Sequence, residues 1–265
     1  MKRKISITID EKILEGIDSV VDNIFIRNRS QAIEHLVKNS LGENKKAVIL
    51  SGGPEKPIMI SEGEFRITAN IKGVTLIERA VKKLRENGFK EIFLVAGHTV
   101  LTKVFDVLKD GTSYGVKMHY VEEKESRGTA YSLRLLKGRI ETSFLVVYGD
   151  ILFDKINLDE LWNQHLKQDS IVTLLLTTSA TPSEKGTVKM QGSKILEFIQ
   201  KPKRSDVYLV FSAIFAAHSE VFEFPGDSLE YEVFPLLAKR GLLEGHISPE
   251  KEIHIHSKED VKRLS

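Results

Sequence analysis

The stretch Ala47-Val-Ile-Leu-Ser-Gly-Gly53 decides the fold of this 265-residue chain, because it is an apolar run that closes on two glycines. Later in the chain, Val147-Tyr-Gly-Asp150 repeats the pattern of an apolar strand that ends on a small residue. Such strand ends are where an open α/β sheet binds its ligands. Glycines there let the backbone approach a phosphate or a base, and an Asp can hold a Mg²⁺ that the phosphates share. The pair of strand ends therefore predicts a nucleotide site.

Composition sets the outer bounds. With 41% hydrophobic and 29% charged residues, the chain can bury a full core and has room for one large and one small domain. No apolar run approaches the roughly 18 residues needed to cross a membrane, and no signal peptide begins the chain, so we expect a cytoplasmic protein without membrane contact. The absence of cysteine excludes disulfides and thiol nucleophiles. The net charge of +2 neither indicates nor excludes nucleic acid.

Residues 1–44 form a first, small domain in the sequence. Residues 4–10 alternate polar and apolar side chains, which predicts a strand with one buried face. Asp10 then caps a predicted helix, and Ser30 precedes a second amphipathic segment that stops at Gly42. One strand and two helices cannot build a stable core in about 40 residues. We therefore expect this domain to fold as a homodimer.

Two motifs of this first domain carry a resemblance: Lys2-Arg-Lys-Ile-Ser-Ile-Thr-Ile-Asp-Glu11 and Arg27-Asn-Arg-Ser-Gln-Ala-Ile33. Together they resemble a ribbon-helix-helix domain, in which strands from two chains form an antiparallel ribbon that lies in the DNA major groove. The resemblance implies DNA as a partner, with contacts from Lys4, Ser6, Thr8, Arg27, Arg29 and Ser30. The alternative is that the fold serves only as a dimerisation clamp.

Residues 45–265 form the second domain, in which strands and helices alternate as far as Tyr148. This alternation predicts an α/β fold with a mainly parallel, Rossmann-like sheet and helices on both faces. Beyond Asp150 the pattern becomes rich in strands. We expect those strands to form a second sheet region that builds the other wall of the cleft.

Residues 46–265 resemble the sugar-1-phosphate nucleotidyltransferases. The motifs that carry the resemblance follow one another in the family's order: Ala47-Val-Ile-Leu-Ser-Gly-Gly53, Ile71-Lys-Gly-Val-Thr-Leu-Ile-Glu78, Arg127-Gly-Thr-Ala130, Val147-Tyr-Gly-Asp150, Lys185-Gly-Thr-Val188, Phe198-Ile-Gln-Lys-Pro202 and Glu232-Val-Phe-Pro-Leu-Leu237. The resemblance implies attack by the phosphate oxygen of a sugar phosphate on the α-phosphorus of a nucleoside triphosphate. Pyrophosphate is released in that reaction, and Mg²⁺ is the expected cofactor.

The resemblance also implies roles for individual residues. The residues expected to bind the nucleotide are Ser51, Gly52, Gly53, Gly128 and Thr129, and those expected to bind the sugar phosphate are Gly186, Gln200 and Lys201. The expected catalytic residues are Lys56, Asp150 and Lys201, and Asp150 is also the expected metal ligand. Two of these residues also have an ordinary structural interpretation. Asp150 can be a cap or turn residue after a buried strand, and Lys201 a solvated lysine before a turn proline.

The chain departs from the family pattern in the loop after the paired glycines and in the sugar wall. Pro54-Glu55-Lys56-Pro57 stands where the family has Gly, Thr, Arg and Leu. Lys56 is the candidate replacement for that Arg, but a lysine lacks the bidentate fork of a guanidinium. Arg66 occupies the position of a later family lysine and keeps its charge. Phe211-Ser212-Ala213 replaces Asn-Ala-Gly, which removes an amide able to bind a sugar hydroxyl.

A third departure concerns the metal. His254 stands where the family has a second metal-binding Asp. An imidazole is a poor ligand for Mg²⁺, which prefers oxygen, so we expect this position to weaken Mg²⁺ binding. His254 and His256 share one face of a predicted strand, either as ligands of a transition metal or as polar residues of an edge strand.

Two functions fit these observations. The first is a nucleotidyltransferase that makes an activated sugar or polyol and carries a ribbon-helix-helix appendage. The second is a DNA-binding regulator whose transferase-like domain senses a nucleotide, a nucleotide sugar or a sugar phosphate without turning it over. The departures favour slow catalysis at best, whereas the retained motifs favour ligand binding in either case.

Overall fold

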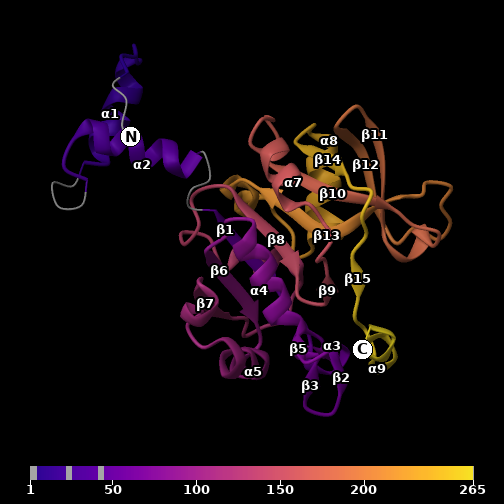
Figure 1. Ribbon diagram of the computed structural model, residues 1–265. Helices are drawn as coiled ribbons and strands as arrows, with labels where there is room; N and C mark the ends of the chain where they lie inside the picture. Colours follow the sequence, from indigo (N-terminus) through magenta and orange to yellow (C-terminus); the bar gives the residue numbers. More distant parts are fainter. Residues whose placement is uncertain (1–4, 22–25, 41–44, 265) are drawn as a thin grey trace. The chain divides into compact units, whose positions relative to one another are not determined.

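The computed structural model describes residues 5–21, 26–40 and 45–264 of the chain. The chain divides into two compact units, Met1–Asn44 and Lys45–Ser265 (Figure 1). The first unit contains α1 (Glu11–Ser19) and α2 (Arg29–Ser40). Among the described helices, none has the length and apolar content needed to span a lipid bilayer.

Local interactions of the first unit account for its two helices. The carboxylate of Asp10 accepts a hydrogen bond of 3.0 Å from the backbone N–H of Lys12, so the predicted cap of α1 is confirmed. Arg29, at the start of α2, forms a bidentate ion pair with Asp18, with contacts of 2.6 and 2.7 Å. Arg29 therefore ties α2 to α1, which is a different role from the DNA backbone contact that the sequence predicts.

The predicted strand of this unit is not formed within the single chain. Residues 5–10, the described part of that stretch, have no regular structure, and the side chains of Ile5 and Ile7 are 76% and 57% exposed. A β-strand needs a hydrogen-bonded neighbour, and the expected neighbour is a second copy. Lys4 and the helix stop at Gly42 lie outside the described residues.

The second unit contains many short elements. Its strands are β1 (Lys46–Leu50), β2 (Met59–Ser61), β3 (Glu64–Phe65), β4 (Asn70–Ile71), β5 (Val74–Thr75), β6 (Glu91–Ala96), β7 (Lys117–Glu122), β8 (Phe144–Tyr148), β9 (Ile151–Leu152), β10 (Val172–Thr178), β11 (Gly186–Gln191), β12 (Lys194–Gln200), β13 (Leu209–Ala217), β14 (Leu243–Ile247) and β15 (Ile253–His254). Its α-helices are α3 (Glu55–Ile58), α4 (Leu76–Glu86), α5 (His98–Leu108), α6 (Thr129–Arg134), α7 (Leu158–His165), α8 (Phe234–Lys239) and α9 (Lys258–Leu264).

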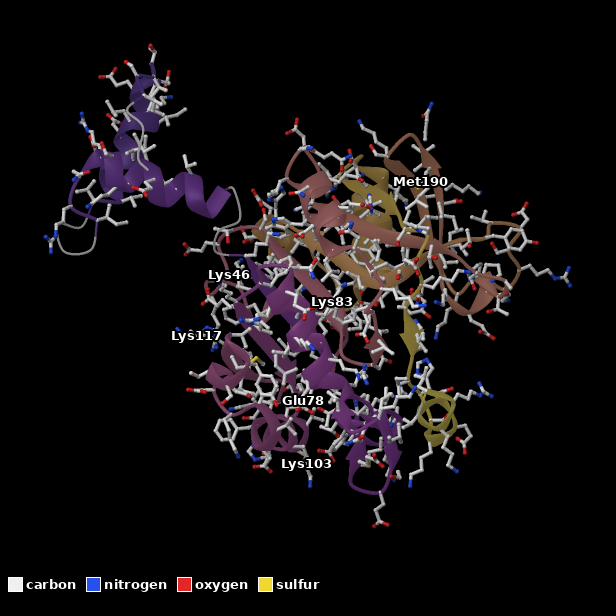
Figure 2. All side chains as sticks on the ribbon, viewed as in Figure 1. Lys46, Glu78, Lys83, Lys103, Lys117 and Met190 are labelled. Atoms are coloured by element: carbon white, nitrogen blue, oxygen red, sulfur yellow. The ribbon has the colours of Figure 1, made fainter. Side chains whose placement is uncertain are left out.

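The central sheet has nine strands in the order β10-β14-β12-β11-β13-β8-β1-β6-β7. Within it, β8, β1, β6 and β7 run parallel to one another, so the predicted parallel sheet is confirmed for this half. Lys46, Glu91 and Lys117 lie in register at the start of three of these strands, and Figure 2 labels the two lysines. The carboxyl ends of the same strands therefore meet at the opposite edge.

The structure corrects the prediction of a second sheet region after Asp150. Strand β13 pairs antiparallel with β8 and so continues the central sheet. Its Val210 is also in register with Thr177 of β10 and with Thr187 of β11, which joins the later strands to the same sheet. The strands after Asp150 that pair in this way therefore belong to the nine-stranded central sheet, and the additional pairing of β10 with β13 joins its edge strand back to a strand in the middle of the sheet.

Both faces of β1 are buried, which explains its continuous apolar sequence. Ala47 and Ile49 belong to one core cluster, whereas Val48 and Leu50 belong to a second cluster on the other face. The first cluster includes buried side chains of α4, α5 and α7, and the second includes those of α6 and α8. The strand is therefore held in the middle layer of the unit.

Helix α4 shows how local sequence fixes an element beside this sheet. Thr75 and Glu78 form a capping box, in which each side chain binds the backbone N–H of the other residue. Glu78, labelled in Figure 2, also accepts a hydrogen bond of 2.7 Å from the hydroxyl of Tyr114. The cap orients the buried face of α4 toward the sheet.

His165 makes the stability of the second unit sensitive to acid. Its side chain is fully buried, and burial, together with the neighbouring His218, lowers the pKa of His165 to about 3. Because the unfolded chain binds this proton near pH 6.5, the contribution to stability is complete above that pH. It is lost as the pH falls from 6.5 toward 3, by about 1.4 kcal/mol per unit once the unfolded histidine is charged.

We expect His165→Gln to reduce the fall in unfolding free energy between pH 7 and pH 5, measured by urea titration of Trp162 fluorescence. The exposed His98 provides the matched control, and His98→Gln should keep the wild-type pH dependence. Equal pH dependence in wild type and His165→Gln would show that His165 is not the group responsible.

Candidate active site

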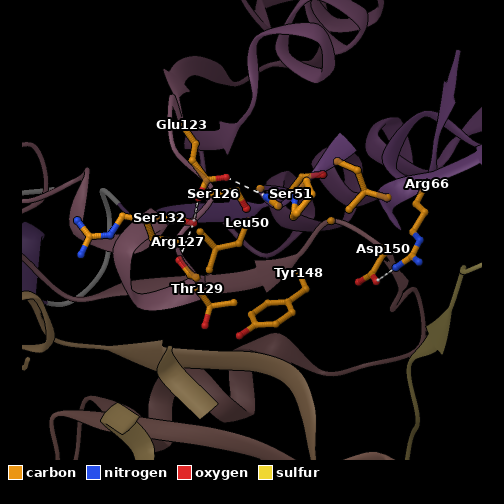
Figure 3. Close-up of a pocket in the computed structure, with 16 residues that line it drawn as sticks. Leu50, Ser51, Arg66, Glu123, Ser126, Arg127, Thr129, Ser132, Tyr148 and Asp150 are labelled. Carbon is orange, nitrogen blue, oxygen red and sulfur yellow. Dashed lines mark hydrogen bonds and ion pairs between the residues drawn. The ribbon is translucent and has the colours of Figure 1, made fainter. Parts of the chain in front are cut away.

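A cleft of about 400 Å³ lies where β1 and β8 end (Figure 3). Its lining comes from three stretches that are far apart in the sequence, with Ile58 and Arg66 added from the segment after β1. The lining residues are Leu50, Ser51, Gly52, Gly53, Pro54, Ile58, Arg66, Glu123, Ser126, Arg127, Gly128, Thr129, Ser132, Tyr148, Gly149 and Asp150. The strand ends singled out in the sequence therefore meet at one cavity.

The glycines after β1 are required by a close contact with Glu123. A Cβ atom on Gly52 would lie only 2.1 Å from the carboxylate oxygen of Glu123. Gly53 has a φ of +114°, which favours glycine, and its backbone N–H donates a hydrogen bond of 2.9 Å to the same oxygen. The two glycines thus let the loop pass directly beside a carboxylate.

Glu123 itself was missed by the sequence analysis. It follows β7, is only 6% exposed, and also accepts a hydrogen bond from the hydroxyl of Ser132. Because Ser132 and Gly53 are neutral donors, the carboxylate retains acceptor capacity toward the cleft. Its position immediately after a parallel strand, the same position as that of Ser51 and Gly149, was the signal that could have found it.

The predicted nucleoside loop is anchored to residues 227–230. Gly128 has a φ of +147°, and a Cβ there would lie 2.4 Å from the carbonyl oxygen of Asp227. The hydroxyl of Thr129 donates to Glu230 at 2.7 Å and accepts from the backbone N–H of Leu229 at 2.9 Å. Tyr148 also donates to Glu230. Burial and the nearby carboxylate raise the pKa of Tyr148, so its hydroxyl remains a donor.

Arginine side chains lie at both ends of the cleft, with Arg66 beside Asp150 at one end and Arg127 at the other (Figure 3). Arg66 contacts the carboxylate of Asp150 at 3.2 Å and donates to the carbonyl of Pro57 at 2.6 Å. Its Nε is buried and has no hydrogen-bond partner among the described residues. Arg66 therefore places a positive charge at this end of the cleft, held in position by Asp150 and by the carbonyl of Pro57.

Asp150 also faces two histidines. Strand β15 pairs with β9, which follows Asp150 directly, so that His254 lies opposite Ile151. The potential metal-binding atoms of Asp150, His254 and His256 all lie within 4.8 Å of one another. Burial lowers the pKa of His256, which keeps its imidazole neutral at pH 7. This donor set of one carboxylate and two imidazoles does not fit Mg²⁺, which prefers oxygen ligands.

A buried carboxylate stands behind His254. The side chain of Glu252 is fully buried and accepts hydrogen bonds from Lys185 at 2.5 Å, from His254 at 3.1 Å and from Ser212. Burial by itself would raise the pKa of Glu252, but these three donors outweigh it and lower the pKa to about 2. Glu252 was not predicted from the sequence, because two of its partners, Lys185 and Ser212, lie 67 and 40 residues away along the chain.

Other predicted catalytic and sugar-phosphate residues lie outside the cleft lining. Lys56 is exposed on α3. Lys201 is exposed after β12, where its backbone N–H donates to the carbonyl of Lys185 at 3.0 Å. Gly186 lies opposite Gln200, and a Cβ on Gly186 would lie 2.4 Å from the ring of Phe198. Packing alone therefore requires glycine at position 186.

The predicted DNA contacts are distributed along the first unit. Ser6, Thr8, Arg27 and Ser30 are exposed there, as DNA contact requires. The backbone N–H of Arg27 donates to the side chain of Gln31 at 2.7 Å. Their role in DNA binding stays a prediction.

The parallel strands, the glycine-lined strand ends and the cleft between them define the second unit as an α/β protein with a cleft at the carboxyl ends of its strands, where open α/β sheets bind ligands. More particularly, the chain belongs to the nucleotidyl transferase family, whose model matches residues 46–233. The matched region leaves out the first unit, so the ribbon-helix-helix assignment stays a prediction.

Two of the proteins similar to this chain are the following. The bifunctional protein GlmU of Methanococcus maripaludis is 27% identical over 180 residues, which are 66% of this chain and 41% of that protein. This chain thus spans about two fifths of its length. The D-glycero-alpha-D-manno-heptose 1-phosphate guanylyltransferase of Aneurinibacillus thermoaerophilus is 26% identical over 200 residues, 71% of this chain and 84% of that protein.

Solved structures share the fold. A putative glucose-1-phosphate thymidylyltransferase from Bacillus anthracis superimposes with a TM-score of 0.75 and covers 83% of this chain and 93% of its own. Its sequence identity is 22%, so it supports the architecture alone.

We expect Gly52→Ala to weaken nucleoside triphosphate binding at least tenfold, because the added methyl group displaces Glu123 and the loop beside it. Isothermal titration calorimetry measures the affinity. Gly97 is the matched control, since a Cβ there meets no atom within 4 Å. Weakening of the same size in Gly97→Ala, or none in Gly52→Ala, would contradict a nucleotide site at the β1 loop.

Proposed function

We propose that the second unit transfers a nucleotidyl group from a nucleoside triphosphate to a sugar phosphate or polyol phosphate. The observation that carries the proposal is the cleft itself, where two glycines, the buried Glu123 and the guanidinium of Arg66 converge. The names of the similar proteins, which include a mannose-1-phosphate guanyltransferase of Yarrowia lipolytica, support the same reaction class.

In the proposed reaction, a phosphate oxygen of the acceptor forms a bond to the α-phosphorus of the nucleotide. The bond from that phosphorus to the oxygen bridging to the β-phosphorus breaks, and pyrophosphate leaves. Such transfers depend mainly on positioning and on neutralisation of phosphate charge. Gly52 and Gly53 allow the backbone to approach the nucleotide, and Arg66 supplies a positive charge that can neutralise phosphate charge at the end of the cleft.

We further propose that the first unit is a DNA-binding homodimer. Its support is the exposed stretch of residues 5–10, in which Ile5 and Ile7 have no cover within the chain and alternate with the exposed Ser6 and Thr8. Pairing with a second copy would bury the isoleucines on one face of a ribbon. The polar side chains would then lie on the other face, where a major groove can receive them.

A regulator that binds the same ligands without turnover is the second candidate function. The observations that favour it are the exposed position of Lys56 and the ion pair between Arg66 and Asp150. In that arrangement the cleft lacks the guanidinium expected after the paired glycines. The negative charge of Asp150 is also already partly neutralised.

Asp150→Asn distinguishes the two candidates. In a transferase we expect the change to reduce pyrophosphate release at least 100-fold, because it removes the charge that orients Arg66 at the phosphates. Release is measured with a set of nucleoside triphosphates and sugar phosphates in the presence of Mg²⁺, Mn²⁺ or Zn²⁺. Asp154, which lies outside the cleft lining, is the matched control, and Asp154→Asn should retain wild-type release.

Wild-type protein that releases no pyrophosphate with any pair, but binds a nucleotide that alters its DNA affinity, would establish the regulator. Absence of both turnover and nucleotide binding would contradict both candidates.

For the first unit, we expect Lys4→Ala and Thr8→Ala to weaken binding to a selected palindromic DNA site at least tenfold. Lys4→Ala should also reduce the discrimination of that site from unrelated DNA, since a contact to a base edge is lost. The charge-matched control is Lys103→Ala in the second unit. Sedimentation should show a dimer at micromolar concentration, and a folded monomer would contradict the ribbon.

A further inference from the structure

One cluster of side chains next to the cleft has a chemistry of its own. We propose that Asp150, His254 and His256 bind a transition-metal ion of the Zn²⁺ or Co²⁺ type in preference to Mg²⁺. Among the described residues, these three bring one carboxylate and two imidazoles together. Imidazole nitrogen suits Zn²⁺ and related ions, whereas Mg²⁺ is held by oxygen.

Backbone hydrogen bonds position the side chains of the cluster formed by Asp150, His254 and His256. Pairing of β15 with β9 fixes His254 beside the residue that follows Asp150, and the N–H of Ile255 donates to the carbonyl of Asp150 at 2.8 Å. Alternation along this extended segment then brings His256 to the same side as His254, and the two imidazole rings stack with centroids 5.4 Å apart. The cluster therefore rests on paired strands rather than on a loop.

The distances are close to those of a metal centre. Nδ1 of His256 lies 3.8 Å from the carboxylate of Asp150, and all three donor atoms lie within 4.8 Å of one another. Since Zn²⁺ binds these ligands at about 2.0–2.2 Å, the donors must approach by roughly 1 Å. The side chain of His256 is 55% exposed and is free to make that rotation.

Glu252 supplies a second, independent observation. An ionised carboxylate can only accept a hydrogen bond, and its 3.1 Å contact with Nε2 of His254 is shorter than the 3.5 Å contact of that nitrogen with Nζ of Lys185, which favours the tautomer with a hydrogen on Nε2. The lone pair is then on Nδ1, the nitrogen left for a metal. Carboxylates that orient a histidine in this way are typical of metal centres. Lys185 balances the charge of Glu252 and keeps it buried.

Arg66 limits the affinity of this site for a metal ion, whereas the position of Asp150 in the cleft lining puts a bound ion within reach of a ligand there. The guanidinium of Arg66 holds Oδ2 of Asp150 at 3.2 Å, the same oxygen that lies 3.8 Å from Nδ1 of His256, so Arg66 competes with the ion for this carboxylate. Because Asp150 lines the cleft, a bound ion would have coordination positions open to a ligand there. The identity of that ligand as a phosphate rests on the proposed function, but binding of the metal alone does not.

The test uses the full chain and the metal alone. We expect calorimetry to show one Zn²⁺ per chain, bound at least tenfold more tightly than Mg²⁺. Co²⁺ should give the visible absorption of a centre with fewer than six ligands. His254→Ala and His256→Ala should each weaken Zn²⁺ binding at least tenfold and lose the Co²⁺ absorption. His98→Ala, which removes an exposed histidine outside the cluster, should change neither.

His254→Asp tests the preference in the opposite direction, and circular dichroism checks that each variant folds. This change should raise Mg²⁺ affinity and lower Zn²⁺ affinity, which a loss of folding cannot mimic. Zn²⁺ binding that is unchanged in folded His254→Ala and His256→Ala, or a wild type that prefers Mg²⁺, would overturn the proposal. Pyrophosphate release without Zn²⁺ binding would overturn the metal site alone. Zn²⁺ binding without nucleotide binding would overturn the proposed function alone.

Discussion

Parallel pairing of β1 with β6 and β8 is the constraint on which the second unit depends. It brings the ends of three strands, which lie far apart in the sequence, to one edge of the sheet. Glycine is needed at that edge for two reasons: Glu123 fills the space where a Cβ of Gly52 would lie, and Gly53 has a φ of +114°. The cleft is therefore a product of backbone packing as much as of polar chemistry.

The sequence predicted those parts of the molecule that local patterns determine. The apolar run of β1, the cap of α1 and the lining positions Gly52, Gly128 and Asp150 follow from short motifs. Glu123 and Glu252 were missed because each has a partner far away in the sequence, Gly53 for Glu123 and Lys185 for Glu252, and spacing along the chain does not reveal such contacts. Lys56 was predicted from its place in the loop where the resembling family has an Arg, but its side chain is exposed on α3.

The same distinction applies to the sheet. The strands before Asp150 connect through helices, which makes parallel neighbours predictable. The later strands were expected to form a separate region, whereas β13 pairs antiparallel with β8 and continues the central sheet. That junction depends on the register of two strands separated by the whole of β9–β12. One departure in the sugar wall also has a structural purpose, because Ser212 donates to the buried Glu252.

The ion pair between Lys185 and Glu252 links two segments that are 67 residues apart in the sequence. Lys185 immediately precedes the β11–β12 hairpin, and Glu252 immediately precedes β15. If the hairpin moved away, Glu252 would either follow it or remain buried without its cation, which is strongly unfavourable. The β11–β12 hairpin and strand β15 are therefore mechanically coupled, so that a force that displaces one of them also acts on the other.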